Sequence, residues 1–327
     1  MSNLYPLKFK TIFKDKIWGG QKIKTILGKD FNPLPNCGET WELSGVEGNI
    51  STVSNGDLMN QPLTELINKY QDRLVGKRIY QKYGNEFPLL VKFIDANDDL
   101  SIQVHPDDQL ARERHSSFGK TEMWYIIQAD EGAKLISGFN QPLDKNKYLE
   151  SFNKGELTNI LNAEDVNKGD VFFIPAGRVH TIGKGLLLAE IQQTSDVTYR
   201  IYDFDRTDDQ GNKRELHVDA ALDAIDYQYY KEYKTSYEDQ KNARVKLVRC
   251  PYFTTNKYSL TNEIKLDHSS LDCFKIYVVV EGGGRISGDG FSESIALGDV
   301  VFVPAELKKY YLETTTGITL LESYIDE

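Results

Sequence analysis

The residues most able to do chemistry are a few polar side chains in or beside short apolar segments. Gln103 and His105 are two residues apart, so a strand would direct both side chains to one face. Lys120 and Glu122 share this spacing at the start of another apolar run, and His180 lies in a third segment. Two imidazoles, one carboxylate and one amide oxygen are a suitable ligand set for a divalent cation such as zinc, iron or copper. The pattern therefore predicts a metal site.

The remaining histidines and the cysteines do not extend this set. His115, His217 and His268 lie in polar sequence contexts, and we expect them at the surface. The cysteines are far apart and form no Cys-x-x-Cys pair: Cys37, Cys250 and Cys273. This usage predicts neither a disulfide framework nor a thiolate metal site, and it indicates a reducing, cytoplasmic location.

Composition excludes several classes of function. The 327 residues are 40% hydrophobic and 27% charged, which is ordinary for a globular protein with a sizeable core. The net charge of −10 argues against nucleic acids and anionic membranes as partners. No apolar run reaches the length of a membrane span, and the N-terminus shows no secretory signal.

The elements that must position the polar residues are mostly strands. Short β-branched or aromatic runs, many bounded by Gly, Asp or Asn, recur at 89–94, 122–127, 171–175, 186–192, 197–203, 275–280, 300–304 and 318–324. Such a series predicts sandwiches or barrels rather than a doubly wound sheet. Helices are expected at 63–74, 144–162 and 216–225, and a further helix capped by Asp107 is expected to begin near Gln109.

One motif occurs twice in the chain. Gly169-Asp-Val-Phe-Phe-Ile-Pro175 recurs as Gly298-Asp-Val-Val-Phe-Val-Pro304, and only the first copy is followed by a glycine and a histidine. The polar stretch 227–244 between the copies is typical of a linker. We therefore predict two related β-barrels, a site-bearing one in residues 1–235 and a degenerate, structural one in residues 236–327.

Several motifs resemble one known family. The segment Gly169-x5-Pro175-x-Gly177-x2-His180 resembles the second motif of the cupin superfamily. Four further motifs are similar to those of type I mannose-6-phosphate isomerases in their short bacterial form: Trp18-Gly19, Leu100-Ser-Ile-Gln103-Val-His105-Pro, Lys120-x-Glu122 and Glu190-x5-Asp196-x3-Arg200. The resemblance covers most of residues 1–206.

The resemblance implies a mainly β fold of two cupin-like barrels, or jelly rolls, with a few short helices. It also implies an enzyme that interconverts mannose 6-phosphate and fructose 6-phosphate through a cis-enediol. One zinc ion per chain would be held by Gln103, His105, Glu122 and His180. The general cupin pattern has His-x-His with a glutamate a few residues later. Here glutamine replaces the first histidine and Glu122 lies farther along the chain, which is also the family's pattern.

The resemblance assigns further residues to the reaction. Glu190 is the first candidate for the general base and Lys120 the second, and the apolar neighbours of Glu190 would raise its pKa. Arg200 would stabilise charge beside the reacting oxygens. For the substrate phosphate, the candidates are Ser101, Lys120, Arg200 and Arg206, with Arg178 as a weaker candidate.

Alternatives remain for single residues and for the whole protein. Glu190 could face outward from its strand, and Arg200 could be the buried ion-pair partner of Asp196 or Asp203. The protein could instead be an iron-dependent cupin oxygenase, against which Gln103 argues. It could also be a non-catalytic sugar-binding cupin. The sequence does not address the oligomeric state.

Overall fold

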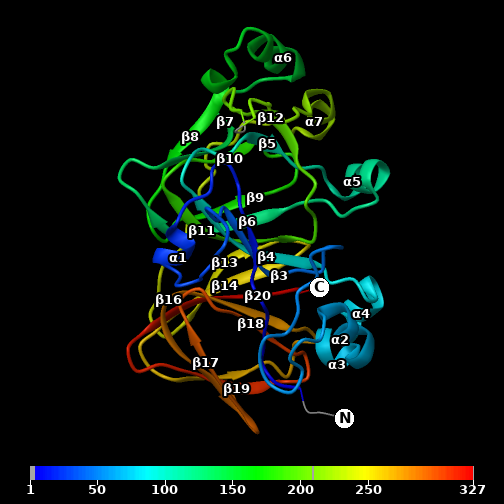
Figure 1. Cartoon of the computed structure of the whole chain (residues 1–327), viewed down its shortest axis with the longest axis vertical. Helices are drawn as coiled ribbons and strands as arrows, with labels where there is room; N and C mark the ends of the chain where they lie inside the picture. Colours follow the sequence, from blue (N-terminus) through cyan, green and yellow to red (C-terminus); the bar gives the residue numbers. More distant parts are fainter. Residues whose placement is uncertain (1–3, 208–209, 327) are drawn as a thin grey trace.

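The computed structural model describes residues 4–207 and 210–326. Two β lobes lie one above the other along the long axis, with the first lobe at the top of Figure 1 and the second at the bottom. The predicted mainly β fold is confirmed. Among the described residues, no helix has the length and apolar character needed to cross a membrane.

The first lobe consists of two antiparallel sheets. The six-stranded sheet has the order β2 (Ile12–Lys14), β3 (Glu39–Leu43), β4 (Leu89–Ala96), β11 (Leu186–Gln193), β6 (Glu122–Ala129) and β9 (Val171–Ile174). The five-stranded sheet has the order β12 (Tyr199–Tyr202), β5 (Ile102–Val104), β10 (His180–Ile182), β7 (Lys134–Phe139) and β8 (Leu161–Asp165).

The second lobe is built on one nine-stranded sheet. Its main path runs β1 (Leu7–Lys8), β18 (Val300–Val303), β16 (Lys275–Gly288), β20 (Ile318–Tyr324), β14 (Thr254–Leu260) and β13 (Arg244–Arg249). The remaining strands are β15 (Ile264–Asp267), β17 (Phe291–Ala296) and β19 (Lys309–Glu313). Because β1 pairs with β18, the N-terminus of the chain completes the C-terminal sheet.

Helices are short and lie outside the sheets. They are α1 (Lys22–Thr25), α2 (Leu63–Tyr70), α3 (Asp72–Val75), α4 (Lys77–Tyr83), α5 (Asp108–His115), α6 (Lys145–Asn153), the 3-10 helix η1 (Leu157–Ile160) and α7 (Val218–Ala224). The predicted helical regions 63–74, 144–162 and 216–225 all contain helix, and α5 confirms the helix capped by Asp107, whose side chain accepts from the Leu110 N–H. In Figure 1, α2, α3 and α4 lie together beside the second lobe.

Strand alternation gives the six-stranded sheet two different faces. On β11, Leu186 and Leu188 pack inside the first lobe, whereas Ala189 and Ile191 join a core shared with the second lobe. Glu190 continues the inward face, so the alternation that buries the apolar residues also directs this carboxylate inward. One end of the lobe interior is therefore apolar and the other is polar.

The core shared by the two lobes contains a cluster of aromatic rings. Phe302 on β18 lies 5.9 Å from Phe87 of the first lobe and 5.2 Å from Phe274, between ring centroids. All three side chains are fully buried. Because these large aromatic side chains are fully buried between the lobes, the two lobes share one core and are not loosely associated domains.

The repeated motif forms the same turn in both lobes. Gly169 and Gly298 have φ values of 89° and 87°, a left-handed conformation that glycine adopts without steric cost. In each turn the following aspartate accepts a hydrogen bond from the backbone N–H three residues earlier, at 2.8 Å for Asp170 and 2.9 Å for Asp299. The repetition predicted from sequence is thus a structural repeat.

Two sequence interpretations need correction. The stretch 227–244 is not a free linker, because Lys234 forms a β-bridge with Phe172 and Tyr233 is only 6% exposed. His268 is not a surface residue, because it is 6% exposed and its Nε2 lies 3.3 Å from Oε1 of the buried Glu322. Both errors concern polar stretches that fold back onto a lobe. The domain boundary at residue 235 stays a prediction.

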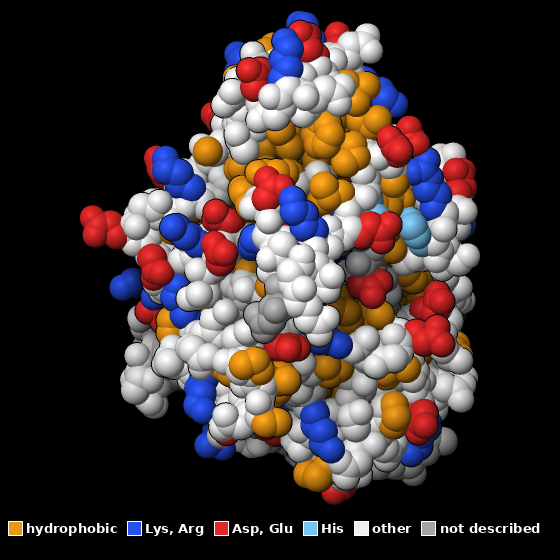
Figure 2. Space-filling view, turned by 45° about the horizontal axis from the view of Figure 1, so that its top comes forward, with side chains coloured by type: hydrophobic (Ala, Val, Ile, Leu, Met, Phe, Trp, Pro, Cys, Tyr) orange, Lys and Arg blue, Asp and Glu red, His pale blue; other side chains and the backbone are white. Residues whose placement is uncertain are grey.

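Charged side chains of both signs are interspersed on the face shown in Figure 2.

His115 is exposed and His217 is half-buried, in keeping with their polar sequence contexts. The three cysteines are free thiols.

The shared aromatic core predicts that the lobes unfold together. We expect Phe302→Ala to lower the free energy of unfolding by about 3–5 kcal/mol, because it leaves a cavity between the lobes. The half-buried Phe291, in the hairpin β16–β17, is the control, and Phe291→Ala should cost clearly less. Thermal unfolding followed by near-UV and far-UV circular dichroism should show one transition. Two separate transitions would contradict a shared core.

Candidate metal centre and active site

Two facing sheets bring the predicted site residues together. In the five-stranded sheet, Gln103 on β5 is paired with Arg200 on β12 on one side and with His180 on β10 on the other. In the six-stranded sheet, Glu122 begins β6 and Glu190 lies on β11. The site therefore lies at the polar end of the first lobe, between the sheets.

His105, Glu122 and His180 form a compact buried cluster. Their potential ligand atoms all lie within 4.8 Å of one another. Nε2 of His180 is 3.4 Å from Oε1 of Glu122, and Nε2 of His105 is 3.7 Å from Oε2. The Gln103 amide adds a fourth group, with its Nε2 3.2 Å from Nε2 of His180. Rotating that amide by 180° exchanges its nitrogen for the oxygen donor that a metal requires.

Backbone carbonyls determine which ring nitrogens face this cluster. Nδ1 of His105 lies 3.0 Å from the carbonyl oxygen of Val197, and Nδ1 of His180 lies 2.8 Å from that of Arg178. A carbonyl oxygen can only accept, so each Nδ1 carries the proton and donates it. Each Nε2 then directs a lone pair toward Glu122, as a metal-ligating histidine does.

The cluster carries unsatisfied acceptors, which is the test of whether a cation fits. Nε2 of His105 and both carboxylate oxygens of Glu122 are buried without any hydrogen-bond partner. Burial, together with the nearby Glu190 charge, raises the pKa of Glu122 to about 8. Burial lowers the pKa of His180 to about 4 and that of His105 well below its usual value. Neutral imidazoles around a buried carboxylate whose oxygens lack hydrogen bonds are suited to a divalent cation.

Glu190 belongs to a second buried charged group. Its Oε1 lies 3.0 Å from Nζ of Lys92, and its Oε2 accepts a 2.9 Å hydrogen bond from Nε1 of Trp124. Lys92 also approaches Glu39, at 3.9 Å. Burial alone would raise the pKa of Glu190, but the ammonium groups of Lys92 and Lys120 outweigh it and lower that pKa. The expected rise from apolar neighbours is therefore wrong, because the strand partner of Glu190 is a lysine.

A polar cleft of about 420 Å³ opens beside these groups. Gln103, Lys120, Glu190 and Arg200 all line it, together with Ser101. The placement of Glu190 excludes the alternative of an outward-facing strand residue. The cleft is thus large enough for a small polar ligand and is bordered by charges of both signs.

Arg200 reaches the cleft without an acidic partner. Its Nη1 donates to the carbonyl oxygen of Glu215 at 2.8 Å, and its Nε is buried without a hydrogen bond. Asp203 is instead paired with Arg206 and Arg214. Among residues 4–207 and 210–326, no carboxylate forms an ion pair with Arg200.

The other predicted cations differ in their positions. Lys120 is buried, with its Nζ 3.6 Å from Oε2 of Glu122. Arg206 is not among the residues that line the cleft; its Nη2 lies 2.6 Å from Oδ1 of Asp203, and its Nη1 donates to the Asp99 carbonyl. The role of Arg206 in substrate binding stays a prediction.

Several cleft residues escaped the sequence analysis. They include Lys14, Lys16, Glu39, Lys92 and Arg214. Lys92 had a recognisable signal, since it is the one charged residue in the apolar run 89–94 and shares the inward face with Ile94. The others lie in polar contexts where nothing local distinguishes a cleft residue from a surface one.

In the second lobe, a lysine stands at the position that is equivalent to Glu122 in the first lobe. Glu122 pairs with Ile174 in the first copy of the repeated motif, and Lys275 pairs with Val303 at the same place in the second copy. Lys275 is fully buried and donates a 2.8 Å hydrogen bond to the Cys273 carbonyl. An ammonium therefore occupies the position of the candidate ligand carboxylate, which is incompatible with a second cation site there.

Comparison with known proteins gives a consistent family match. Residues 6–161 match the catalytic domain of type I phosphomannose isomerases, and residues 243–324 match the cupin domain of mannose-6-phosphate isomerases. The chain is 34% identical to a mannose-6-phosphate isomerase of Streptococcus mutans serotype c, over 94% of this chain and 95% of that protein. It is 36% identical to mannose-6-phosphate isomerase ManA of Bacillus subtilis, over 94% and 96% of the two chains.

A solved structure supports the same match. The crystal structure of the mannose 6-phosphate isomerase from Bacillus subtilis superposes with a TM-score of 0.87 at 33% identity. The match covers 97% of this chain and 99% of that one.

The buried cluster predicts how the protein binds metal. We expect the purified protein to bind one divalent cation per chain, and His105→Ala and His180→Ala each to abolish stoichiometric binding, because each removes one of few neutral nitrogen donors. His115→Ala is the matched control, since that histidine is exposed and outside the cluster. Elemental analysis after dialysis measures the stoichiometry. Full metal content in either buried-histidine variant would contradict the assignment.

Proposed function

The chain belongs to the type I phosphomannose isomerase family and is a mannose-6-phosphate isomerase, and from that premise we propose that it uses one zinc ion and a cis-enediol intermediate. The reaction interconverts the aldose mannose 6-phosphate and the ketose fructose 6-phosphate. The observation that supports this most is the set of unpartnered acceptors on His105 and Glu122, which lie close to the cleft lined by the carboxylate of Glu190.

The proposed ligands are Gln103, His105, Glu122 and His180. Two neutral imidazoles, one carboxylate and one amide oxygen suit zinc, which adds no redox chemistry to a reaction without net electron transfer. When bound, the cation would act as a Lewis acid and stabilise negative charge on the substrate oxygens in the transition state.

The proposed proton transfers involve Glu190. In the aldose-to-ketose direction, C2 loses its proton to the base while O1 takes up a proton, which gives the cis-enediol. The base then returns a proton to C1 while O2 loses its hydroxyl proton, which leaves the ketone at C2. Glu190 is suited to the first step because it lines the cleft and the lysines keep it ionised. Trp124 and Lys92 fix the orientation of its two oxygens. Lys120 remains the second candidate for the base.

The proposed binding of the rest of the sugar phosphate relies on cleft cations. The guanidinium of Arg200 has no acidic partner among the described residues, so it can bind an oxyanion of the substrate. Ser101 lies two residues before Gln103 and lines the same cleft, where its hydroxyl can donate to a phosphate oxygen. Arg214 also lines the cleft and adds a cation that the sequence analysis did not include.

Removal of the metal tests the proposed function directly. We expect chelation to abolish the conversion of mannose 6-phosphate to fructose 6-phosphate and stoichiometric Zn²⁺ to restore it. A Lewis-acid contribution of several kcal/mol corresponds to a loss of at least about a hundredfold. A coupled assay of fructose 6-phosphate gives the rate. Full activity in metal-free protein would contradict the proposal, as would oxygen consumption without isomerisation.

The Lys92–Glu190 pair predicts a change in pH dependence. Because the pKa of Glu190 is lowered, the acid limb of kcat that it causes should lie below the usual carboxyl range in the wild-type enzyme. Lys92→Met removes the ammonium but keeps Glu190 buried, so the pKa should rise and the limb should move to higher pH. Lys14→Met is the control, since Lys14 also lines the cleft but its Nζ binds Asn49.

The measurement is kcat as a function of pH, with circular dichroism used to establish that each variant is folded. An unchanged limb in Lys92→Met would exclude Glu190 as the group that titrates in catalysis.

A further inference from the structure

Arg178 lies two residues before the candidate ligand His180, and neither the family match nor the mechanism gives it a role. Its side chain is 7% exposed. The guanidinium carbon lies 4.6 Å from the ring centroid of Tyr230 and 4.6 Å from that of Tyr233. No carboxylate of the described residues forms an ion pair with Arg178. A buried cation held between two aromatic rings is a strong and directional anchor.

Both tyrosines belong to residues 226–235, called the connecting segment here, which overlap the predicted linker 227–244. Hydrogen bonds hold the hydroxyls of both tyrosines in place. The hydroxyl of Tyr233 donates to the carbonyl oxygen of Phe139 at 2.8 Å and accepts from the Phe139 N–H at 3.0 Å. The hydroxyl of Tyr230 donates to Oδ2 of Asp226 at 2.9 Å. The ring of Tyr233 also occupies the space beside Gly138, where a Cβ would lie 2.3 Å from the ring. The rings that hold Arg178 are therefore part of the first lobe.

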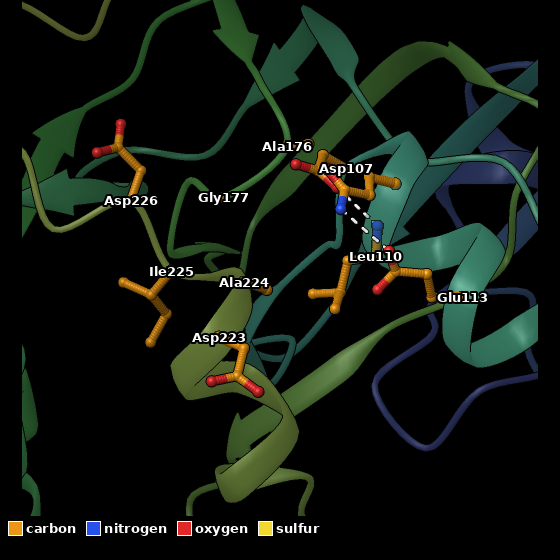
Figure 3. Close-up of a pocket in the computed structure, with 10 residues that line it drawn as sticks. Asp107, Leu110, Glu113, Ala176, Gly177, Asp223, Ala224, Ile225 and Asp226 are labelled. Atoms are coloured by element: carbon orange, nitrogen blue, oxygen red, sulfur yellow. Dashed lines mark hydrogen bonds between the residues drawn. The ribbon is translucent and has the colours of Figure 1, made fainter.

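The turn at Gly177, which precedes His180, is hydrogen-bonded to the backbone of His105 on one side and to Asp226 of the connecting segment on the other. The Gly177 N–H donates to the His105 carbonyl at 2.9 Å, and the Gly177 carbonyl accepts from the Asp226 N–H at 2.8 Å. Figure 3 shows the turn at Gly177 beside residues Ala224, Ile225 and Asp226. Gly177 has a φ of 89°, and a Cβ there would lie 3.0 Å from the Ala224 carbonyl oxygen. Glycine is thus needed for both the conformation and the close approach.

We propose that Arg178, held between Tyr230 and Tyr233, is a positioning residue for the metal centre. Its carbonyl oxygen receives the Nδ1 proton of His180, so the position of this peptide determines the tautomer and the ring orientation of that ligand. Anchoring the side chain keeps the carbonyl in place when the cation is absent. The connecting segment would then preorganise the site, in addition to joining the lobes. This inference rests on the proposed metal centre and extends it to a segment outside both family matches.

The test compares three variants for zinc affinity and for the His180 tautomer. Arg178→Met removes the cation but keeps an unbranched side chain and the carbonyl. Because the carbonyl is then no longer anchored, Zn²⁺ binding should weaken by up to the about 10–100-fold that loss of an outer partner of a metal ligand causes. Arg178→Lys retains a cation over the rings and should recover part of the affinity. Lys234→Met is the matched control, because Lys234 lies in the same segment but pairs with Asp170, away from His180.

Two measurements separate positioning from simple stabilisation. Competition with a chelator gives the Kd for Zn²⁺. Nitrogen-15 NMR of the metal-free protein shows whether His180 carries its proton on Nδ1, which we expect in the wild-type and Lys234→Met proteins but not uniformly in Arg178→Met. A lower Tm with unchanged Kd and tautomer in Arg178→Met would overturn the proposal.

If Arg178→Met fails to fold, a second variant tests the positioning role of Arg178. Tyr230 is half-buried, so Tyr230→Leu should fold, and losing one ring should also weaken zinc binding, by less than Arg178→Met. Wild-type affinity in Tyr230→Leu would then overturn the proposal. Absence of zinc binding by the wild-type protein would contradict the metal centre itself, which distinguishes that failure from failure of Arg178 as a positioning residue.

Discussion

A buried carboxylate between two neutral imidazoles is the interaction on which the active site depends. Glu122 has no hydrogen bond to either oxygen, and the Lys120 Nζ lies 3.6 Å from its Oε2. Burying a charge without compensation is costly, and burial accordingly raises the pKa of this carboxyl to about 8. A divalent cation would remove that cost, since it satisfies the orphaned oxygens and the two Nε2 lone pairs together. The site is therefore arranged so that a cation could bind between these groups.

The neighbouring carboxylate, Glu190, has the opposite electrostatic environment. Glu190 has a lysine and an indole N–H as direct partners, so it stays ionised although it is buried. Two inward-facing carboxylates from adjacent strands thus differ in electrostatic environment. Both oxygens of Glu122 lack hydrogen bonds, whereas Glu190 is kept ionised by groups of the protein itself. This division follows the logic by which environment assigns different roles to two acidic groups in one site.

The two lobes show how one fold can carry a site or dispense with it. The Gly-Asp turn, its internal hydrogen bond and its strand pairings recur in both. In each, a lysine from a distant segment pairs with the turn aspartate: Lys234 with Asp170, and Lys8 with Asp299. The difference lies inside, where Lys275 replaces the carboxylate of Glu122. The second lobe retains the framework and contributes a large apolar surface to the shared core.

What the sequence determined by itself was local. The two-residue spacing of Gln103 and His105, the repeated Gly-Asp turn and the alternation of apolar residues depend on neighbours along the chain, and so they predicted the strands and the ligand types. The family resemblance supplied the reaction. Tertiary structure decided which charged groups meet their partners: Lys92 meets Glu190, and Arg178 meets two tyrosines of a presumed linker. These partners lie far apart in sequence. Lys92 and Glu190 meet because their strands pair within one sheet, and Arg178 meets the tyrosines because the connecting segment folds back onto the first lobe.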